Sequence, residues 1–236
     1  MQTGGTAHRT QVIAHRGDWS EFPENSLESF ERAIQVGADM IELDLRRTAD
    51  GHLIAYHDAA VKGIPIARLR HGALRAKGGA SRPPLLAEVV AQLAGRIALN
   101  LEFKERGCVA EAAMLLRRAK VEQCLITSFL DDVLREAKAQ APQFPTGLVV
   151  DGSTTISPVT RARRLGADCV VVELRRADVA TLGAAAAADL PCLVWTVNDS
   201  ATIDRCLRDP AVVGVITDRP ALAIERRARL SEQTGP

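Results

Sequence analysis

Short apolar runs rich in β-branched residues recur along the chain, and segments with helical periodicity separate them. Runs of this kind are typical of strands buried on both faces of a parallel sheet. They cover residues 11–15, 39–45, 96–103, 124–129, 146–150, 168–173, 192–197 and 213–217. Apolar positions at helical spacing predict helices over residues 26–37, 85–95, 109–120, 131–140, 158–165, 178–189, 199–208 and 219–230. The alternation predicts a parallel sheet covered by helices.

The number of strand–helix units bears on whether this sheet is closed. Eight units in a chain of 236 residues favour a (β/α)₈ TIM barrel. An open, doubly wound sheet is the alternative, because periodicity does not show closure. We expect a single barrel domain over residues 11–230, with flexible tails at 1–10 and 231–236.

The gap between the second and third strands is wide and predicts inserted structure. Residues 46–58, "RRTADGHLIAYHD", are typical of a β-hairpin around Asp50-Gly51, a dipeptide that suits a two-residue type I′ turn. Such a turn would pair Ala49 with His52 and place His57 opposite Asp44. Residues 59–84, rich in Gly, Pro and Arg, are expected to form a short loop with one short helix over one face of the barrel.

Composition narrows the class of protein. Hydrophobic residues make up 47% of the chain, enough for a substantial core, and the formal net charge of +1 argues against a nucleic-acid partner. Five widely spaced cysteines suit reduced, buried thiols rather than a disulfide framework. With no signal-like segment and no run long enough to cross a bilayer, we expect a soluble cytoplasmic protein without stable membrane insertion. The sequence leaves open a monomer or a homo-oligomer.

Charged residues gather where the first three strands of the predicted barrel end. The ends are, in order, His15 with Arg16, Glu42 with Asp44, and Glu102 with Lys104. The carboxyl ends of barrel strands share one face, where the active sites of this fold lie.

Glu42 and Asp44 are two residues apart, so both side chains point to the same face of the strand. They would repel each other unless a cation or a basic side chain lay between them. With Glu102 they offer three carboxylates and no matching Cys or His set, which favours Mg²⁺ or Ca²⁺ over zinc.

The basic residues complete a set suited to phosphodiester cleavage. Arg16 and Lys104 can hold a phosphate, the first as a planar fork and the second as a point charge. Histidine is the side chain suited to proton transfer near neutral pH, so His15 and His57 can act as an acid/base pair. A lone histidine at a strand end is more often structural, but the joint occurrence of these residues favours function.

The segment after the first strand, "GDWSEFPENSLESF", predicts the start of the first helix. Asn25 or Ser26 is placed to cap that helix, and Ser26 with Ser29 does not match the capping-box pattern. Glu24 precedes this cap as an acidic residue at the helix start.

The motifs "AHRG", "PENS", "GADMIELDLRRTADGHLIAYHD" and "LNLEFK", in this order, resemble those of the glycerophosphodiester phosphodiesterases, as do "VWTVN" and "GVITDRP" near the C-terminus. The resemblance covers residues 11 to 222. It implies a TIM-barrel hydrolase that acts on a small-molecule glycerophosphodiester and yields sn-glycerol 3-phosphate and an alcohol. It also implies a divalent cation and a cyclic phosphate formed by attack of the substrate's own glycerol hydroxyl.

The resemblance further implies a role for each site residue. His15 and His57 would be the catalytic acid/base pair, Arg16 and Lys104 the phosphate contacts, and Trp195 part of the substrate pocket; Glu42, Asp44 and Glu102 would bind the metal. Glu24, with Asn25, would orient His15 or contact the metal shell. Apart from the resemblance, the position of Glu173 at the end of the sixth predicted strand leaves two roles open for it, contact with glycerol hydroxyls or pairing with Arg175.

Two other functions stay open. A lyase-type, phospholipase D-like enzyme would release a cyclic phosphate from a lipid, and exposed apolar loops would favour it. A non-catalytic barrel that binds a phosphorylated metabolite would be expected to have lost a His or a metal carboxylate. The segment 59–84 is also short for the family, so substrate closure would depend on little more than this loop.

Overall fold

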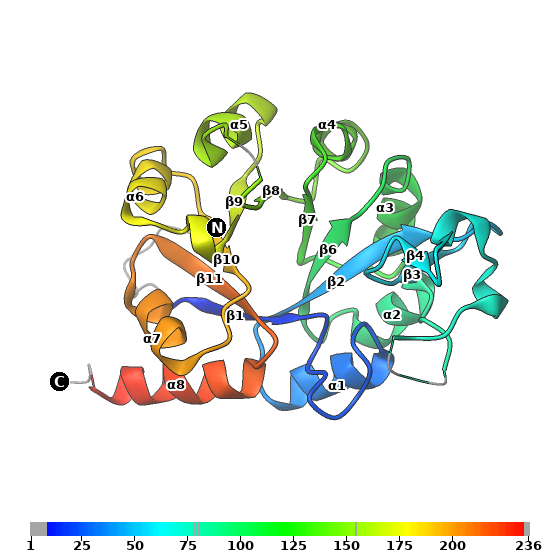
Figure 1. The fold of residues 1–236 in the computed structure, drawn as a ribbon, viewed down its shortest axis with the longest axis horizontal. Helices are drawn as coiled ribbons and strands as arrows, with labels where there is room; N and C mark the ends of the chain where they lie inside the picture. Colours follow the sequence, from blue (N-terminus) through cyan, green and yellow to red (C-terminus); the bar gives the residue numbers. More distant parts are fainter. Residues whose placement is uncertain (1–8, 78, 80, 154, 234–236) are drawn as a thin grey trace.

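A closed parallel barrel forms the centre of the molecule. The computed structural model describes residues 9–77, 79, 81–153 and 155–233. The barrel strands are β1 (Gln11–His15), β2 (Met40–Arg47), β6 (Ala98–Phe103), β7 (Cys124–Ser128), β8 (Thr146–Val150), β9 (Cys169–Glu173), β10 (Cys192–Trp195) and β11 (Val212–Thr217). They pair in chain order, and β1 pairs with both β11 and β2, which closes the ring (Figure 1). The predicted (β/α)₈ barrel is therefore confirmed, and the open sheet is excluded.

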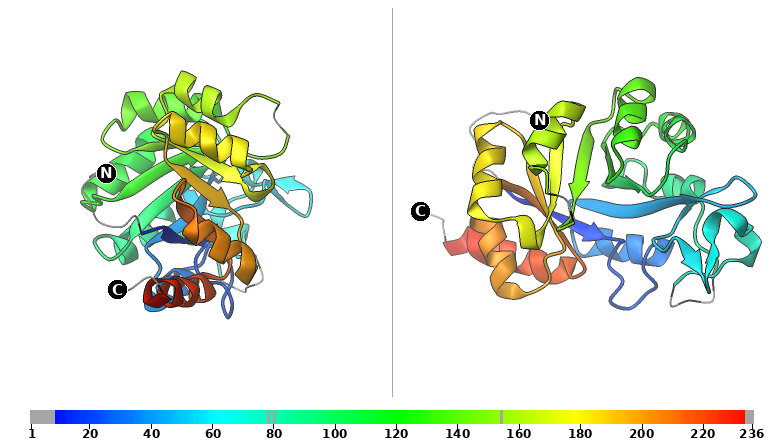
Figure 2. Two further views of the ribbon diagram at one scale, coloured as in Figure 1. Left: turned by 90° about the vertical axis from the view of Figure 1, so that its left-hand side faces the viewer. Right: turned by 45° about the horizontal axis from the view of Figure 1, so that its top comes forward.

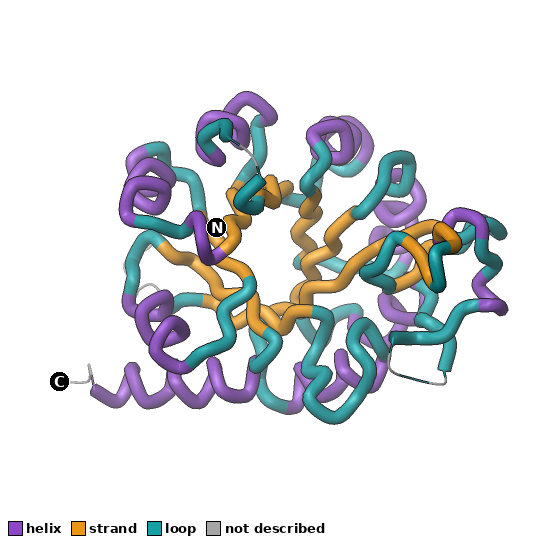
Figure 3. Tube along the Cα trace, in the orientation of Figure 1, coloured by secondary structure: helices purple, strands orange, loops and turns teal. Residues whose placement is uncertain are grey.

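Helices surround this ring on its outer side, as Figure 3 shows. They are α1 (Leu27–Gln35), α2 (Leu86–Leu93), α3 (Val109–Arg118), α4 (Asp131–Gln140), α5 (Pro158–Leu165), α6 (Val179–Ala187), α7 (Ser200–Arg208) and α8 (Pro220–Gln233). Each predicted helix is present. Ser26 caps α1, and Ser29 completes a capping box with it, so the prediction of no box was wrong. A serine hydroxyl returns the hydrogen bond for which the usual pattern has Glu or Gln.

Apolar side chains fill both sides of the strands. Two large clusters lie between the strands and the outer helices, and a smaller one, including Ile13, Val149 and Ile216, fills the barrel interior. Gly147 is required in this interior, because a Cβ atom there would lie 2.8 Å from Sγ of Cys169 and 2.9 Å from Cγ2 of Thr127. The interior is a packed core that supports the mouth from below.

The hairpin after β2 has a different register from the one predicted. β3 (Leu53–Ala55) pairs with β2 through Leu45–Ala55 and Arg47–Leu53, and Tyr56 donates its N–H to the carbonyl of Asp44. The loop has three residues, ending in Gly51 at φ 84°, rather than two. Tyr56, not His57, is therefore opposite Asp44.

The insertion, residues 59–84, is built from small elements rather than one short helix. β4 (Ala60–Val61) and β5 (Ile64–Pro65) form a hairpin, followed by the 3₁₀ turns η1 (Ile66–Arg68) and η2 (His71–Ala73). Ile66 and Leu74 pack with Ile54 and Tyr56 in a separate apolar cluster. The turned view in Figure 2 shows this segment beside the hairpin that extends β2.

Both expected tails are partly ordered. Thr10 is buried, and its hydroxyl lies 3.3 Å from the carbonyl oxygens of Leu207 and Val212. α8 continues to Gln233, so residues 231–233 are helical. Residues 1–8 and 234–236 of the expected tails lie outside the described residues. Among the described residues, no helix has the length and apolar character needed to cross a membrane.

Candidate active site

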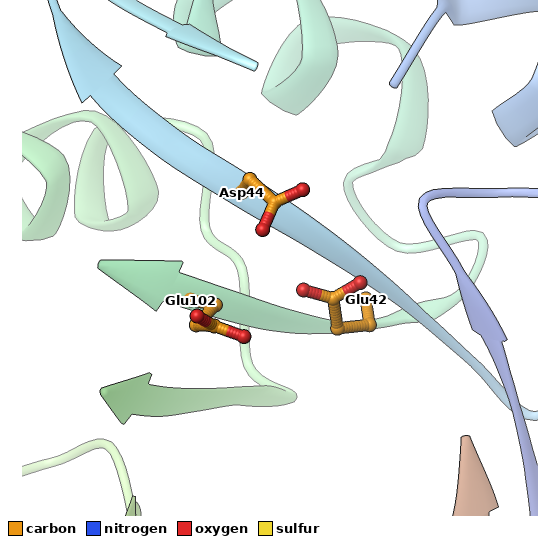
Figure 4. A group of neighbouring side chains, drawn as sticks. All are labelled: Glu42, Asp44 and Glu102. Carbon is orange, nitrogen blue, oxygen red and sulfur yellow. The ribbon is translucent and has the colours of Figure 1, made fainter. Parts of the chain in front are cut away.

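Strand register brings the three predicted metal carboxylates together. β1 and β2 pair His15 with Glu42, and β2 and β6 pair Asp44 with Glu102. Figure 4 shows Glu42 and Asp44 on one strand and Glu102 on the next, with carboxylates converging on a common space. Glu42 is 2% exposed and Asp44 is 1% exposed, so solvent does little to screen their repulsion.

The pKa values of these carboxyls diverge as a result. Burial, followed by the charge of Asp44, raises the pKa of Glu42 to about 8. Burial would also raise the pKa of Asp44, but the charges of Lys104 and Arg16 outweigh it and lower that pKa to about 2. Burial raises the pKa of Glu102 despite its contact with Lys104. Oppositely shifted acids in one cleft are typical of functional sites.

Lys104 and Arg16 supply the positive charge between the acids. Nζ of Lys104 lies 2.8 Å from Oδ1 of Asp44 and also forms an ion pair with Glu102. Nε of Arg16 lies 3.2 Å from Oδ2 of Asp44, while its backbone N–H donates to Oε2 of Glu42 at 3.1 Å. A basic side chain therefore occupies part of the space where the sequence suggested either a cation or a base.

The acid cluster fits a hard divalent cation. One ligand atom from each of Glu42, Asp44 and Glu102 lies within 4.8 Å of the others. Oε1 of Glu42 is buried without a hydrogen-bond partner among the described residues, and such an atom is costly unless something binds it. An all-oxygen donor set of this kind suits Mg²⁺ or Ca²⁺.

A carboxylate at the end of the last strand orients His15. Oδ1 of Asp218 lies 2.6 Å from Nδ1 of His15, and Nδ2 of Asn198 donates to its other oxygen at 2.6 Å. Burial alone would lower the pKa of His15, but the hydrogen bond to Asp218 and the charge of Glu42 raise it. Sequence reasoning gave Asp218 no role in the site, because this contact joins residues 203 positions apart.

Glu24 does not fulfil the expected orienting role. Its Oε2 accepts a hydrogen bond from Nη1 of Arg16 at 2.9 Å, and its Oε1 lies 3.4 Å from Nζ of Lys77. Asn25, at φ 54°, donates from Nδ2 to Oδ2 of Asp44 at 2.9 Å. The two residues thus position Arg16 and Asp44, and Asp218 is the acid that contacts His15.

The backbone after β1 turns sharply beside the acids. Arg16 and Gly17 have φ values of 61° and 84°. A Cβ atom on Gly17 would lie 2.5 Å from Oγ of Ser29 and 2.7 Å from its carbonyl carbon. Only glycine fits both the left-handed backbone and this close approach to α1.

His57 reaches the mouth although its predicted register was wrong. Its Nδ1 lies 2.9 Å from Oδ1 of Asp58, and its carbonyl accepts a hydrogen bond from Nε of Arg46 at 2.8 Å. β3 ends at Ala55, so the alternation of a strand no longer dictates where residue 57 points. Both histidines thus have a carboxylate at Nδ1, which leaves Nε2 for proton transfer.

A small cavity unites these groups. It measures about 90 Å³ and is lined by His15, Arg16, Glu42, His57, Asn100, Glu102, Lys104, Thr127, Phe129, Val149, Val171, Trp195 and Ile216. The ring of Phe129 contacts Trp195 edge-on, with 5.7 Å between centroids. Sequence reasoning missed Asn100, although it is a polar residue two positions before Glu102 on the same face of a buried strand. Oγ1 of Thr127 donates to its side-chain oxygen at 2.7 Å.

A second, wider cavity of about 770 Å³ lies beside it, and Trp195 lines both. Glu173 lines this second cavity. Its Oε1 accepts from Nε of Arg175 at 2.7 Å, and its Oε2 accepts from the N–H of Gly152 at 2.8 Å. Glu173 thus pairs with Arg175, and the other role that the sequence left open for it, contact with glycerol hydroxyls, stays a prediction.

The fold and site define a (β/α)₈-barrel enzyme with an acidic, histidine-flanked mouth suited to phosphodiester chemistry. The chain matches the glycerophosphoryl diester phosphodiesterase family over residues 15–68 and 96–222, and it belongs to that family. It is thus a phosphoric diester hydrolase, as its resemblance in sequence indicated.

Individual relatives agree with this assignment. A glycerophosphodiester phosphodiesterase from Caldanaerobacter subterraneus subsp. tengcongensis is 29% identical over 92% of this chain and 97% of its own. Two solved structures share the fold. The enzyme from Parabacteroides distasonis has a TM-score of 0.80 at 24% identity, over 98% of this chain and 100% of its own. An Oleispira antarctica phosphodiesterase in complex with the product sn-glycerol-3-phosphate has a TM-score of 0.81 at 24% identity, over 94% and 97%.

Proposed function

We propose that this protein hydrolyses glycerophosphodiesters to sn-glycerol 3-phosphate and an alcohol, with the help of a divalent cation. The observation that supports this most is the convergence of two histidines, two basic side chains and two of the three carboxylates on one cavity. The product bound by the Oleispira antarctica relative supports the same substrate class.

His15 and His57 act as the acid/base pair. A hydroxyl of the substrate's glycerol attacks phosphorus while one histidine accepts its proton. The bond from phosphorus to the alcohol breaks, and the other histidine donates a proton to the leaving oxygen. This yields a cyclic phosphate, which water then opens with the histidine roles reversed. Asp218 and Asp58 hold the two rings by their Nδ1 atoms.

Arg16 and Lys104 contact the phosphate. The planar guanidinium of Arg16 is held by Glu24 and Asp44, which fixes its orientation before substrate binds. Trp195 lines the wall between the two cavities, so it contacts the groups on either side of the phosphate, and Glu173 contacts glycerol hydroxyls.

Glu42, Asp44 and Glu102 would hold Mg²⁺ or Ca²⁺, and Asn25 would position Asp44 through its hydrogen bond to Oδ2. When bound, the ion neutralises phosphate charge and lowers the pKa of a nearby hydroxyl. Glu42 would have to lose a proton to become a ligand, because burial raises its pKa to about 8 in the protein without metal.

A cytoplasmic location completes the proposal. Its support is that all five cysteines are buried and unpaired, as expected in a reducing compartment. The substrate is a small molecule.

Hydrolysis of glycerophosphocholine tests this function, followed by phosphorus NMR with added Mg²⁺ or Ca²⁺ and with EDTA. We expect glycerol 3-phosphate as the end product, loss of turnover in EDTA, and a transient cyclic phosphate. In His57→Ala, turnover should fall by about 10²–10⁴-fold. The matched control is His52→Ala, a nearby histidine outside the cavity. Full activity of His57→Ala or unchanged turnover in EDTA would contradict the mechanism, and accumulation of cyclic phosphate alone would indicate the lyase reaction instead.

A further inference from the structure

The insertion has an unusual distribution of charge. Residues 59–84 contain six Lys and Arg and no Asp or Glu. The rest of the chain then has 24 Lys and Arg against 29 Asp and Glu, a formal charge of −5. The nearly neutral formal charge of the whole chain is therefore the sum of a basic segment and an acidic remainder. The six cations of this basic insertion are Lys62, Arg68, Arg70, Arg75, Lys77 and Arg82.

These cations are exposed and mostly free of acidic partners. All six side chains belong to exposed residues. Among the described residues, only Lys77 of the six has a carboxylate oxygen within ion-pair distance, namely Glu24 at 3.4 Å and Asp58 at 3.6 Å. Several exposed arginines outside the insertion do have an acidic partner, as Arg96 has in Glu31 at 2.8 Å. The positive charge of the insertion is thus left available to a partner.

The part of the insertion that carries five of its six cations, residues 59–77, is held against the side of the barrel. Ile66 and Leu74 are each 1% exposed and anchor it to the barrel side. The N–H of Ala49 donates to the carbonyl of Leu69 at 2.9 Å, and the N–H of His71 donates to Oδ1 of Asp50 at 3.0 Å. A cationic surface that is already ordered loses little conformational entropy when it binds.

The insertion also borders the mouth of the barrel. Lys77 joins it to Glu24, which holds Arg16, and to Asp58, which holds His57. In Figure 1 the insertion lies beside the end of β2 from which its hairpin extends. A partner bound to the basic insertion would therefore lie next to the opening of the active site.

We propose that the basic insertion, residues 59–84, is a docking surface that holds the mouth of the barrel against a membrane surface rich in anionic lipid headgroups. Each cation near such a surface adds to the attraction, which falls off within a Debye length. The acidic remainder of the protein is repelled by the same surface, so the charge asymmetry also selects one orientation. The contact is peripheral and electrostatic, without insertion of a helix.

Lipid is favoured over nucleic acid by the apolar residues of the segment. Residues 59–84 contain no Phe, Tyr or Trp that could stack on bases. Instead, Ile64, which is 47% exposed, lies two residues after Lys62 in the β4–β5 hairpin. An aliphatic side chain flanked by cations suits the interface between headgroups and acyl chains.

Vesicle co-sedimentation tests this docking without any measurement of turnover. Its outcome is therefore independent of whether the proposed function is correct. The probes are vesicles of phosphatidylcholine alone and of phosphatidylcholine with an equal amount of phosphatidylglycerol. We expect the protein to partition onto the anionic vesicles only, and to be released at about 0.5 M salt, where the Debye length is a few ångströms.

The variant Lys62→Gln/Arg68→Gln/Arg70→Gln should weaken this partitioning on the order of 100-fold. Its matched control is Arg117→Gln/Arg118→Gln/Lys120→Gln, at and just after the end of α3. Both triple variants remove three positive charges, from two exposed arginines and one exposed lysine. The lysine has a positive φ in each case, 49° for Lys62 and 55° for Lys120. The control should bind as the wild type does. Circular dichroism and the Tm check that both variants fold.

Four results would overturn the proposal. The first is no partitioning of the wild type onto anionic vesicles, and the second is an equal loss in both triple variants. The third is tighter binding of a single-stranded oligonucleotide than of the vesicles at the same salt. The fourth is a lower kcat/KM on a water-soluble substrate in the insertion variant with unchanged vesicle binding, which would mean that the insertion steers substrate instead.

Discussion

The two ends of the barrel use acidic residues in opposite ways. At the amino end, the segments "GADM" and "GADC" place Asp39 and Asp168 before β2 and β9. Oδ2 of Asp39 accepts the N–H of Val12 at 2.7 Å, and Oδ2 of Asp168 accepts the N–H of Thr146 at 2.6 Å. The backbone N–H of Asp39 also donates to the carbonyl of Val12, and the backbone N–H of Asp168 donates to the carbonyl of Thr146. The same sequence pattern thus connects β2 to β1 and β9 to β8, through two hydrogen bonds at each place.

Each of these amino-end acids is also matched with a cation. Arg227 forms an ion pair with Asp39, and Nζ of Lys138 lies 2.7 Å from Oδ2 of Asp168. At the mouth, by contrast, Glu42, Asp44 and Glu102 crowd one another, and Oε1 of Glu42 has no hydrogen-bond partner among the described residues. We therefore expect the acids at the amino end to stabilise the fold, and those at the mouth to be retained at a cost to stability for the sake of the proposed reaction.

The largest expected effect that separates the two ends is on activity. Glu42→Gln removes one proposed metal ligand while keeping the shape of the side chain, so kcat/KM should fall by about 10³-fold or more. Asp168→Asn, the control at the opposite end, should retain full activity at a temperature where it is folded. Steady-state hydrolysis of glycerophosphocholine with added metal measures both. Similar losses in the two variants would remove the distinction between the ends.

A smaller effect is expected for the acid that orients His15. Asp218→Asn keeps a hydrogen-bond acceptor but replaces the charge-assisted hydrogen bond that raises the pKa of His15 with a neutral one. We expect kcat to fall by about 10–10²-fold with KM nearly unchanged, and the pH limb that belongs to His15 to move to lower pH. A pH profile of kcat and KM measures this. An unshifted profile with a lower Tm would indicate a purely structural role.

The smallest expected effect concerns stability at the amino end. Asp168→Asn loses a charge-assisted hydrogen bond to the N–H of Thr146 and an ion pair with Lys138. Since the side chain is about half exposed, we expect the free energy of unfolding to fall by about 1–2 kcal/mol. Urea unfolding at neutral pH measures it, with Asp132→Asn on the exposed surface of α4 as the control. An unchanged midpoint would show that this strand tie is dispensable.

The sequence predicted the barrel well because eight repeats of one pattern reinforce each other, and the strand ends supplied the acids, His15 and Arg16 directly. It failed where a single residue of loop length decides the outcome, as in the hairpin with its three-residue turn at Gly51. It also left Asp218 without a role, since its contact with His15 exists only once β11 closes the barrel against β1.

Local chemistry was harder to predict where ordinary residues serve unusual roles. Ser29 completes a capping box in place of an acidic residue. Glu24 was expected to orient His15 or to contact the metal shell, and it accepts a hydrogen bond from Arg16, which follows Glu24's position in the fold rather than any local pattern. The doubled "GAD" pattern was visible in the sequence, yet its function depends on hydrogen bonds between neighbouring parallel strands that no local pattern specifies.

The pH dependence of unfolding, measured in EDTA, tests the contrast between the two ends most directly. The raised pKa of Glu42, about 8, lies above its unfolded value of about 4.3, so the wild type should lose stability as pH rises between these values. Burial would raise the pKa of Asp168, but the hydrogen bonds from Lys138 and Thr146 lower it, so its contribution should be present above about pH 3.9 and lost at more acidic pH. Glu42→Gln should therefore be more stable than the wild type by about 1–3 kcal/mol near neutral pH, with a gap that closes towards pH 4. Asp168→Asn should be less stable at neutral pH, with a gap that closes below pH 4. If Glu42→Gln instead destabilises the metal-free protein at neutral pH, the acids of the mouth support the fold, and the account is contradicted.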